Sequence, residues 1–410
     1  MNTLKDYDFN GKRVIIRCDL NVPMSNNEIT DDTRIIASLE TINYLISKNA
    51  KVIILSHLGK VKKEEDKEKN SLYKVYLKLK DLLDTNVYFS KDTCSNNLTE
   101  MANMLKEKDV MLVENTRFED IKGKKESSCD LELSKYWASL GDIFVNDAYG
   151  ALHRAHASTV GIAQFLPNAI GFLVEEEINK IDNFLNEKNE PFVVIMGGKK
   201  VSDKIKVIDN LIKKCDKLLI GGAMSFTFLY ALGYKINNDL IDYDSIDYCK
   251  NLLFNYGNKI NLPVDFKVSS SLESDVILNK TIAEINDNEY GYDIGDKTIE
   301  LFKKHLENSG KVLMNGPVGV FENDNYSTGT YEIYKYLDDN KIKTLIGGGD
   351  SASSINKLGF AKKFYHVSTG GGATLEYLEG KTLPGLEVIN KFKKKNNCTI
   401  KKVLNKTVNF

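Results

Sequence analysis

The sequence predicts an α/β protein with two doubly wound parallel sheets, because short apolar runs alternate with longer helical patterns in both halves of the chain. The runs are apolar at almost every position, which is typical of parallel strands covered by helices on both faces. In chain order they read RVIIRC, KVIILS, VMLVEN and DIFVND, followed by FVVIMGG, KLLIGG, KVLMNG, KTLIGGG and FYHVSTGG.

The length and composition predict two domains. The chain has 410 residues, of which 42% are hydrophobic and 28% are charged, which is enough for more than one buried core. A break lies near Pro167, and the segment after it has the apolar spacing of one amphipathic helix. We expect a first domain over 1–167, a connecting helix over 168–189, a second domain over 190–386 and a basic tail over 387–410.

The charge and the apolar content exclude several classes of partner. A net charge of -1 lacks the basic excess of a protein that binds nucleic acid or an anionic membrane. No stretch approaches the roughly 20 apolar residues of a membrane helix, and the start of the chain does not resemble a signal peptide. The six cysteines are far apart, so we expect reduced thiols in a cytoplasmic protein rather than disulfides or a zinc site.

The residues that follow the strands differ between the two halves. Ligands of open parallel sheets bind beyond the carboxyl ends of the strands, so these positions predict the sites. Polar residues follow the early strands: Asp19, Asn21, Ser56, His57, Asn115, Arg117, Asn146 and Asp147. Glycines follow the late ones: Gly197, Gly198, Gly221, Gly222, Gly316, Gly347 to Gly349 and Gly370 to Gly372.

Arginine is rare in this chain and is confined to the first half. Five of the 56 basic residues are arginine, and a planar guanidinium is the group that holds carboxylate or phosphate with two hydrogen bonds. Arg34, Arg117 and Arg154 therefore predict an anion site, whereas Arg13 can be an ordinary surface charge. Arg17 is either a ligand of the anion or part of a structural ion pair. The histidines of this half are either donors to an acidic substrate or structural residues: His57, His153 and His156.

The glycines of the second half predict a phosphate site. Both KTLIGGGDSASSI and FYHVSTGGGATLEYL read as strand, glycines, helix, and backbone amides at the start of a helix attract anions. One such loop could be a plain turn, but several at the same sheet edge favour phosphate binding. Lys200 and Lys204 could add two amines if a helix begins near Lys200, although either one can be a surface charge.

One of these loops matches a dinucleotide pattern but lacks its context. Gly347 to Ala352 fits GxGxxA, yet no acidic residue ends the next strand to bind a ribose hydroxyl. Asp350 would repel a bare pyrophosphate, whereas it can hold a magnesium ion that bridges nucleotide phosphates. An NAD-dependent dehydrogenase is therefore disfavoured, and a GxxxxGK[ST] loop is absent from the sequence.

Several longer motifs resemble the phosphoglycerate kinase family, in the family's order, from about residue 10 to 386. They are RCDLNVP, ITDDTR, SHLG, ENTRF, VNDAYGALHRAHAST, KVSDKI, MNGPVGVFE, GGGDSA and HVSTGGGATLEYLEGKTLPG. The resemblance implies two Rossmann-like domains joined by a helix that close by hinge bending. It also implies a monomeric cytoplasmic enzyme of glycolysis, which transfers a phosphoryl group reversibly from 1,3-bisphosphoglycerate to Mg-ADP and yields 3-phosphoglycerate and ATP.

The resemblance also implies site residues. The substrate would be held by Asp19, Asn21, Arg34, His57, Lys60, Arg117 and Arg154. The nucleotide would be held by Gly198, Lys200, Lys204, Gly222, Gly291, Asn315, Pro317, Glu322, Gly348, Gly349, Asp350 and Ser351, with Glu322 on the ribose and Asp350 on Mg²⁺. Arg34, Lys200 and the amide of Gly371 would act on the transferring group.

The chain departs from the family pattern at three positions. Lys60 replaces an arginine of SHLGRP, Lys199 adds a charge to the usual GGAKVSDK, and Ala223 stands where glycine is common. A non-catalytic relative is the remaining rival. It would be expected to lose Arg34, Lys200, Lys204 or Asp350, and the sequence keeps all four.

Overall fold

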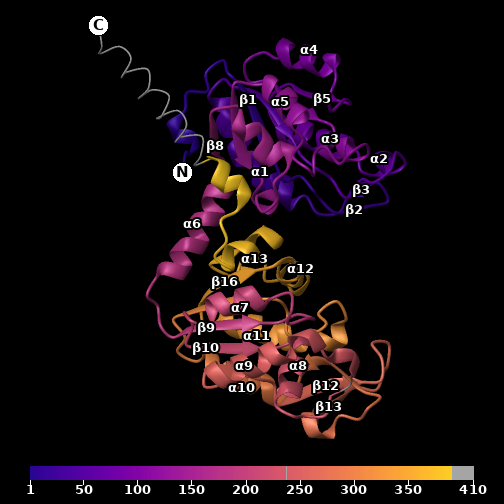
Figure 1. Ribbon diagram of the computed structural model, residues 1–410, viewed down its shortest axis with the longest axis vertical. Helices are drawn as coiled ribbons and strands as arrows, with labels where there is room; N and C mark the ends of the chain where they lie inside the picture. The colour runs from indigo at the N-terminus through magenta and orange to yellow at the C-terminus, as the bar shows by residue number, and fades with distance from the viewer. Residues whose placement is uncertain (237, 390–410) are drawn as a thin grey trace. The chain divides into compact units, whose positions relative to one another are not determined.

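The computed structural model describes residues 1–236 and 238–389, which form two compact units (Figure 1). The first unit contains Met1–Asn179 and the described residues from Thr382 onward, and the second contains Lys180–Lys381. Each has a parallel sheet of six strands. The doubly wound α/β class predicted from the sequence is therefore present in both units.

The sheet of the first unit has the strand order β5-β6-β4-β1-β7-β8, and every neighbouring pair is parallel. Its strands are β1 (Arg13–Cys18), β4 (Lys51–Leu55), β5 (Val87–Ser90), β6 (Val110–Val113), β7 (Ile143–Asp147) and β8 (Asn168–Ile170). The helices between them are α1 (Thr33–Ser47), α2 (Asp66–Lys69), α3 (Tyr73–Leu82), α4 (Asn96–Met104) and α5 (Leu131–Ser139), and a short hairpin joins β2 (Met24–Ser25) to β3 (Glu28–Ile29).

Both faces of this sheet are buried. In β1, Val14 and Ile16 pack with Ile42 of α1 in one cluster of fully buried side chains. Ile15 lies between them in the sequence and is fully buried as well. Because side chains alternate along a strand, burial at successive positions requires helices on both faces. This explains why the strands read as continuous apolar runs.

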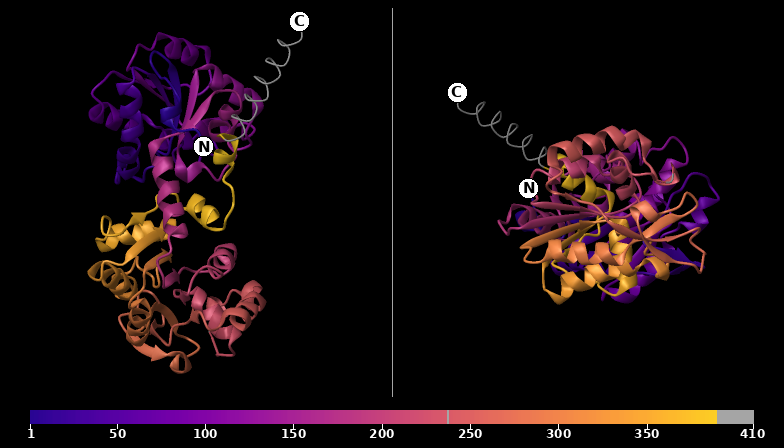
Figure 2. Two further views of the ribbon diagram at one scale, coloured as in Figure 1. Left: turned by 90° about the vertical axis from the view of Figure 1, so that its left-hand side faces the viewer. Right: turned by 90° about the horizontal axis from the view of Figure 1, so that it is seen from below.

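The second unit, in orange to yellow and pink in Figure 2, repeats the plan. Its strand order is β11-β10-β9-β15-β16-β17, and every neighbouring pair is parallel. Its strands are β9 (Phe192–Met196), β10 (Lys217–Ile220), β11 (Ile260–Asn261), β15 (Lys311–Asn315), β16 (Lys343–Gly347) and β17 (His366–Val367). The helices are α7 (Ile205–Leu211), α8 (Met224–Ala231), α9 (Ile246–Tyr256), α10 (Asp296–Leu306), α11 (Thr328–Asp339), α12 (Gly349–Leu358) and α13 (Gly372–Leu378).

A small antiparallel sheet in the second unit was not predicted. It has the order β13-β12-β14 and consists of β12 (Asp265–Ser269), β13 (Leu278–Thr281) and β14 (Tyr290–Ile294). Its strands mix apolar and polar residues, so they carry no continuous apolar run. Phe226 of α8 stacks on Phe266 of β12 at 4.4 Å between ring centroids, which attaches this sheet to the rest of the unit.

The connecting helix α6 (Phe172–Asn186) begins later than the sequence predicts. Residues 168–170 are not helical but form strand β8. The division between the units falls inside α6, after Asn179, and Gly385 of the returning chain donates a 2.9 Å hydrogen bond to the carbonyl oxygen of Leu152. The predicted boundaries at 167, 190 and 386 stay predictions, and residues 390–410 of the predicted tail lie outside the described residues.

Candidate active site

The first unit has a hollow of about 1110 Å³, here called the Arg117 hollow, at the carboxyl ends of its strands. Five of the predicted substrate residues line it: Asn21, His57, Lys60, Arg117 and Arg154. They come from the loops after β1, β4, β6 and β7, which meet at one edge because the strands are parallel. The structure thus brings together residues that lie more than a hundred positions apart in the sequence.

The other two predicted substrate residues, Asp19 and Arg34, pair with each other near this hollow. Arg34 Nη1 lies 2.7 Å from Asp19 Oδ2. Burial alone would raise the pKa of Asp19, but Arg34 and its other neighbours hold that pKa below its ordinary value. Asn21 accepts a 2.8 Å hydrogen bond from the amide of Gly59 and so links the loops after β1 and β4.

The guanidinium of Arg117 is already held in place by the protein. Its Nη1 lies 3.0 Å from Asp120 Oδ2 and donates a 2.7 Å hydrogen bond to Ser127 Oγ. Arg154 is exposed, and its Nε contacts Nε2 of His153 at 3.1 Å. Lys60 is exposed as well. Its ammonium group acts as a point charge, whereas the guanidinium of an arginine at this position could form two hydrogen bonds.

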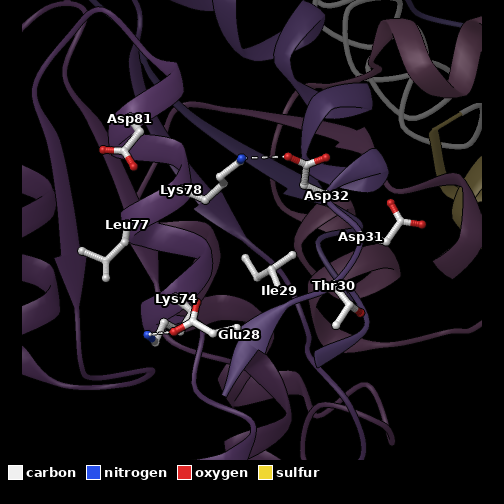
Figure 3. Close-up of a pocket in the computed structure, with 9 residues that line it drawn as sticks. All are labelled: Glu28, Ile29, Thr30, Asp31, Asp32, Lys74, Leu77, Lys78 and Asp81. Carbon is white, nitrogen blue, oxygen red and sulfur yellow. Dashed lines mark hydrogen bonds and ion pairs between the residues drawn. The ribbon is translucent and has the colours of Figure 1, made fainter. Parts of the chain in front are cut away.

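A separate hollow of about 550 Å³ in the first unit contains none of the predicted site residues (Figure 3). It lies between residues 28–32 and helix α3. Two ion pairs join these walls: Lys74 with Glu28 at 2.7 Å and Lys78 with Asp32 at 2.8 Å. Since both lysines are paired with carboxylates, we assign no ligand to this place.

The second unit has a hollow of about 410 Å³, here called the Asp350 hollow, beside the glycine loops. Six of the predicted nucleotide residues line it: Gly198, Gly222, Gly291, Pro317, Glu322 and Asp350. A side chain at Gly291 would place its Cβ 2.4 Å from the buried ring of Phe226, so any larger residue would require that ring to move. Ala223, one of the departures, lines the same hollow.

Three other predicted nucleotide residues, Lys204, Asn315 and Ser351, make hydrogen bonds within the protein close to this hollow. Lys204 Nζ donates a 2.8 Å hydrogen bond to the carbonyl oxygen of Asn315 and a second to its side-chain oxygen. Ser351 Oγ accepts a 2.7 Å hydrogen bond from the amide of Gly316. Burial lowers the pKa of Lys204 to about 8, against the opposing effect of Asp350.

The conditional prediction that a helix begins near Lys200 is wrong. Helix α7 begins at Ile205 with Lys204 as its N-cap, and Lys200 lies in the loop before the turn that precedes the helix. Lys199 and Lys200 are both exposed and line a smaller hollow of about 270 Å³ next to Ala223. The two amines at 200 and 204 therefore do not form one face of a helix.

The glycines before α12 and α13 have the backbone conformation that the glycine loops predict. Gly348 is the N-cap of α12 with a φ of 97°, and Gly371 is the N-cap of α13 with a φ of 52°. A side chain is strained at such angles. A Cβ built at Gly349 or at Gly371 meets nothing within 4 Å, so no neighbouring residue crowds either position.

The surroundings of Asp350 fit magnesium only together with a nucleotide. Among the described residues, no group of three or more His, Cys, Asp or Glu side chains could hold a metal. Asp350 is an exposed carboxylate that lines its hollow, and Mg²⁺ commonly binds one or two carboxylates, several waters and the phosphates of its substrate.

Residues 4–381 match the family model described as phosphoglycerate kinase. A protein of Enterococcus faecalis named phosphoglycerate kinase is 51% identical over 393 residues, which span 95% of this chain and 98% of that protein. The chain belongs to the phosphoglycerate kinase family. A protein of the same name from Fusobacterium nucleatum is 50% identical over 392 residues, 94% of this chain and 98% of its own.

The solved structure of phosphoglycerate kinase from Coxiella burnetii matches with a TM-score of 0.83 and 35% identity, over 96% of this chain and 99% of that one. The family and the fold class predicted from the sequence are confirmed. So is the class of enzyme, a phosphotransferase with a carboxyl group as acceptor that acts in glycolysis. In the described residues, no helix is both long and apolar enough to pass through a bilayer.

Nothing in the sequence indicated the buried residues that support the Arg117 hollow. Glu126 and Ser158 lie behind the Arg117 hollow with exposed fractions of 0% each. Glu126 stands in KGKKESSCD, which reads as a solvated charge run, and nothing in that string distinguishes it from a surface carboxylate. Only the folded chain shows that it is buried beside an arginine.

Proposed function

We propose that this protein transfers the acyl phosphate of 1,3-bisphosphoglycerate reversibly to Mg-ADP and so produces 3-phosphoglycerate and ATP. The observation that supports this proposal is the contrast between the Arg117 hollow and the Asp350 hollow. The Arg117 hollow has cationic side chains on the first unit, and the Asp350 hollow has glycine loops and a carboxylate on the second. A small acid with two anionic groups suits the former, and a metal-bound polyphosphate suits the latter.

On the first unit, we assign the acid to the cations and donors of the Arg117 hollow. Arg117 is pre-oriented by Asp120, and fixed donors lose little entropy when a ligand binds. Lys60 and Arg154 are exposed and can move to a phosphate or a carboxylate. Arg34 would neutralise charge on the transferring group, while Asp19 holds its guanidinium. His57 and Asn21 complete the proposed set.

On the second unit, we assign the nucleotide to the glycine-lined hollow. Gly198, Gly222, Gly291 and Pro317 would bound the base and sugar, with Glu322 on the ribose. The amides at Gly348, Gly349 and Ser351, together with Lys200 and Lys204, would hold the phosphates. Asp350 would hold Mg²⁺, which when bound neutralises phosphate charge. Glu322 is exposed and can reach a ligand in the hollow.

Phosphoryl transfer of this kind requires positioning and charge neutralisation rather than a nucleophilic side chain. Arg34, Lys200 and the amide of Gly371 are the groups we assign to the transferring phosphoryl oxygens. Direct transfer also requires the two ligands to meet during turnover and water to be kept from the acyl phosphate. The proposal includes a cytoplasmic monomer. It also includes no nucleic acid or membrane partner, because the net charge is close to zero.

The test is a coupled assay of ATP formation from enzymatically generated 1,3-bisphosphoglycerate, with and without magnesium. We expect ATP only with magnesium, and thermal-shift titrations in which Mg-ADP and 3-phosphoglycerate each raise the Tm while NAD does not. Ligand binding without ATP formation would instead support a non-catalytic relative. A Tm raised by NAD alone would support a dehydrogenase. Light scattering on the purified chain tests the monomer.

A further inference from the structure

Arg17 is a charged side chain inside the first sheet. It is 1% exposed, and its neighbours across β4 and β7 are Leu55 and Asn146. A guanidinium is tolerated in such a place only where its N–H groups find acceptors and a negative charge lies near. The sequence left open whether Arg17 binds a ligand or forms an ion pair, and its contacts now decide this.

All three nitrogens of the Arg17 guanidinium have partners. Nε donates a 2.9 Å hydrogen bond to Ser158 Oγ, and Nη1 donates to the carbonyl oxygen of Cys18. Nη2 lies 3.0 Å from Nδ1 of His57. The negative charge comes from Glu126, which is fully buried and accepts hydrogen bonds from the amide and the hydroxyl of Ser158.

The contact between Arg17 and His57 determines where the imidazole carries its proton. A guanidinium has five N–H donors and no acceptor, and it keeps its charge in proteins. Its Nη2 must therefore donate to His57 Nδ1, so Nδ1 is the bare nitrogen of the ring. A neutral imidazole that accepts at Nδ1 carries its proton on Nε2. His57 also lines the Arg117 hollow, where that N–H is its remaining polar atom.

We propose that Arg17, braced by Ser158 and Glu126, is a positioning residue that fixes His57 as the neutral Nε2–H tautomer, so that the ring offers an acidic ligand a hydrogen bond without a charge. The inference deepens the proposed function and rests on the binding of 3-phosphoglycerate in this hollow. In this arrangement the arginines supply the positive charge, and His57 supplies a hydrogen bond of fixed orientation.

The charged groups around His57 keep the ring neutral over the working pH range. Burial first, and then Arg17, lower the pKa of His57 to about 3. Arg117 and Arg34 act in the same direction from η2 (Thr116–Asp120) and α1, while Asp19 opposes them. Protonation would place a cation against Arg17, whose donor at 3.0 Å would then face a second N–H. We therefore expect no titration of His57 between pH 5.5 and 8.

The direct test is nitrogen NMR of the full chain with ¹⁵N-labelled histidine, which gives only five residues to assign. The His57→Gln variant identifies the His57 signals. We expect a protonated Nε2 and a bare Nδ1 that do not change from pH 5.5 to 8. In Arg17→Met we expect a mixture of tautomers and a titration nearer the ordinary pKa of about 6.5. Arg13→Met is the matched control, because Arg13 lies in the same strand and pairs with Asp142 instead.

Arg17→Met leaves Glu126 buried without its partner, so the double variant Arg17→Met/Glu126→Gln removes both charges together. The wild-type spectrum alone already decides the tautomer if neither variant folds. A cationic His57 at pH 7, a proton on Nδ1, or an Arg17→Met spectrum identical to wild type would each overturn the inference.

The enzymatic consequence separates positioning from a merely structural role. We expect Arg17→Met to raise the KM for 3-phosphoglycerate about tenfold, the scale of one misdirected hydrogen bond to a charged group. This loss should shrink below pH 6, where a freed His57 gains a proton, whereas wild type and Arg13→Met show no such change. A KM deficit that is independent of pH contradicts the inference. Wild-type protein that fails to bind 3-phosphoglycerate would defeat the proposed function while leaving the NMR result intact.

Discussion

Lys204 Nζ donates a 2.8 Å hydrogen bond to the carbonyl oxygen of Asn315, which joins the N-cap of α7 to the end of β15. Burial lowers the pKa of this lysine to about 8, and Asp350 and Asp203 limit the shift. The amine is therefore charged at neutral pH, but it loses its proton as the pH rises through about 8. Few lysines lose their charge so close to physiological pH.

The first prediction concerns nucleotide affinity at alkaline pH. If Lys204 helps to hold the phosphates, the affinity for Mg-ADP should fall as the pH rises from 7 to 9.5, because the neutral amine no longer attracts them. Lys204→Met should bind more weakly and lose most of this pH dependence. Isothermal titration calorimetry measures both. Lys206→Met is the matched control, since that lysine is exposed on the same helix; an equal pH slope in Lys204→Met and wild type would refute the role.

The second prediction concerns the two cations assigned to the transferring group. Arg34→Ala and Lys200→Ala should each lower kcat by about a thousandfold, the scale for loss of one charged ligand of the transition state. Steady-state kinetics of ATP formation measures this. Arg13→Ala should retain nearly full activity, because Arg13 pairs at the other end of β1 with Asp142. A loss below about tenfold in either variant would exclude that residue from the transfer step.

The third prediction concerns Lys60, where the family pattern has arginine. Lys60→Arg should lower the KM for 3-phosphoglycerate severalfold, because a guanidinium can bind a phosphate or carboxylate with two hydrogen bonds where an ammonium acts as a point charge. The value of kcat should change less, since Lys60 is not assigned to the transferring group. Lys62→Arg provides the comparison, because Lys62 lines the same hollow. An unchanged KM in Lys60→Arg would show that lysine at this position does not weaken the binding of 3-phosphoglycerate.

Part of the site could be predicted because its residue types are rare in this chain. Arg117 and Arg154 were singled out by the scarcity of arginine, and both line the same hollow. The same signal marked Arg17 but could not give its role. That role depends on Ser158, 141 positions away, and on the buried state of Glu126. Contacts of this range are set by strand order, which the sequence pattern alone does not specify.

The strands were predictable from the sequence where every residue of the strand is apolar and buried. They were less predictable where apolar and polar residues mix along the strand. The central strands are apolar at every position because both faces are covered. β12 is buried at four of its five positions but mixes charged with apolar residues, β14 begins with alternating half-buried and buried residues, and β13 has no buried residue. None of the three therefore has a continuous apolar run. The start of α7 was misplaced because lysines at 200 and 204 have helical spacing, whereas spacing says nothing about where the first turn closes.

The last relationship links a buried carboxylate to the connecting helix. Asp147 Oδ1 accepts a 3.3 Å hydrogen bond from the amide of Val174 in the first turn of α6. Gly171 precedes the helix, and a Cβ there would lie 2.2 Å from the same oxygen. The other oxygen, Oδ2, has no hydrogen-bond partner among the described residues. At the far end of α6, Lys311 Nζ donates a 2.7 Å hydrogen bond to the carbonyl oxygen of Phe184.

The fourth prediction follows from the ionisation of Asp147. Burial raises its pKa to about 7, against the hydrogen bonds that favour the charged form. Between about pH 4 and 7 the folded protein therefore holds a proton that the unfolded chain has released, so this group stabilises the fold at low pH and that contribution is lost as the pH rises to about 7. Urea unfolding at pH 4.5, 6 and 7.5 should show up to about 1.4 kcal/mol lost per pH unit from this one group. Asp147→Asn cannot ionise and should remove that component of the slope, while Asp81→Asn, on an exposed carboxylate, should keep it. A slope in Asp147→Asn equal to that of wild type would mean that Asp147 is ionised in the folded protein throughout this range.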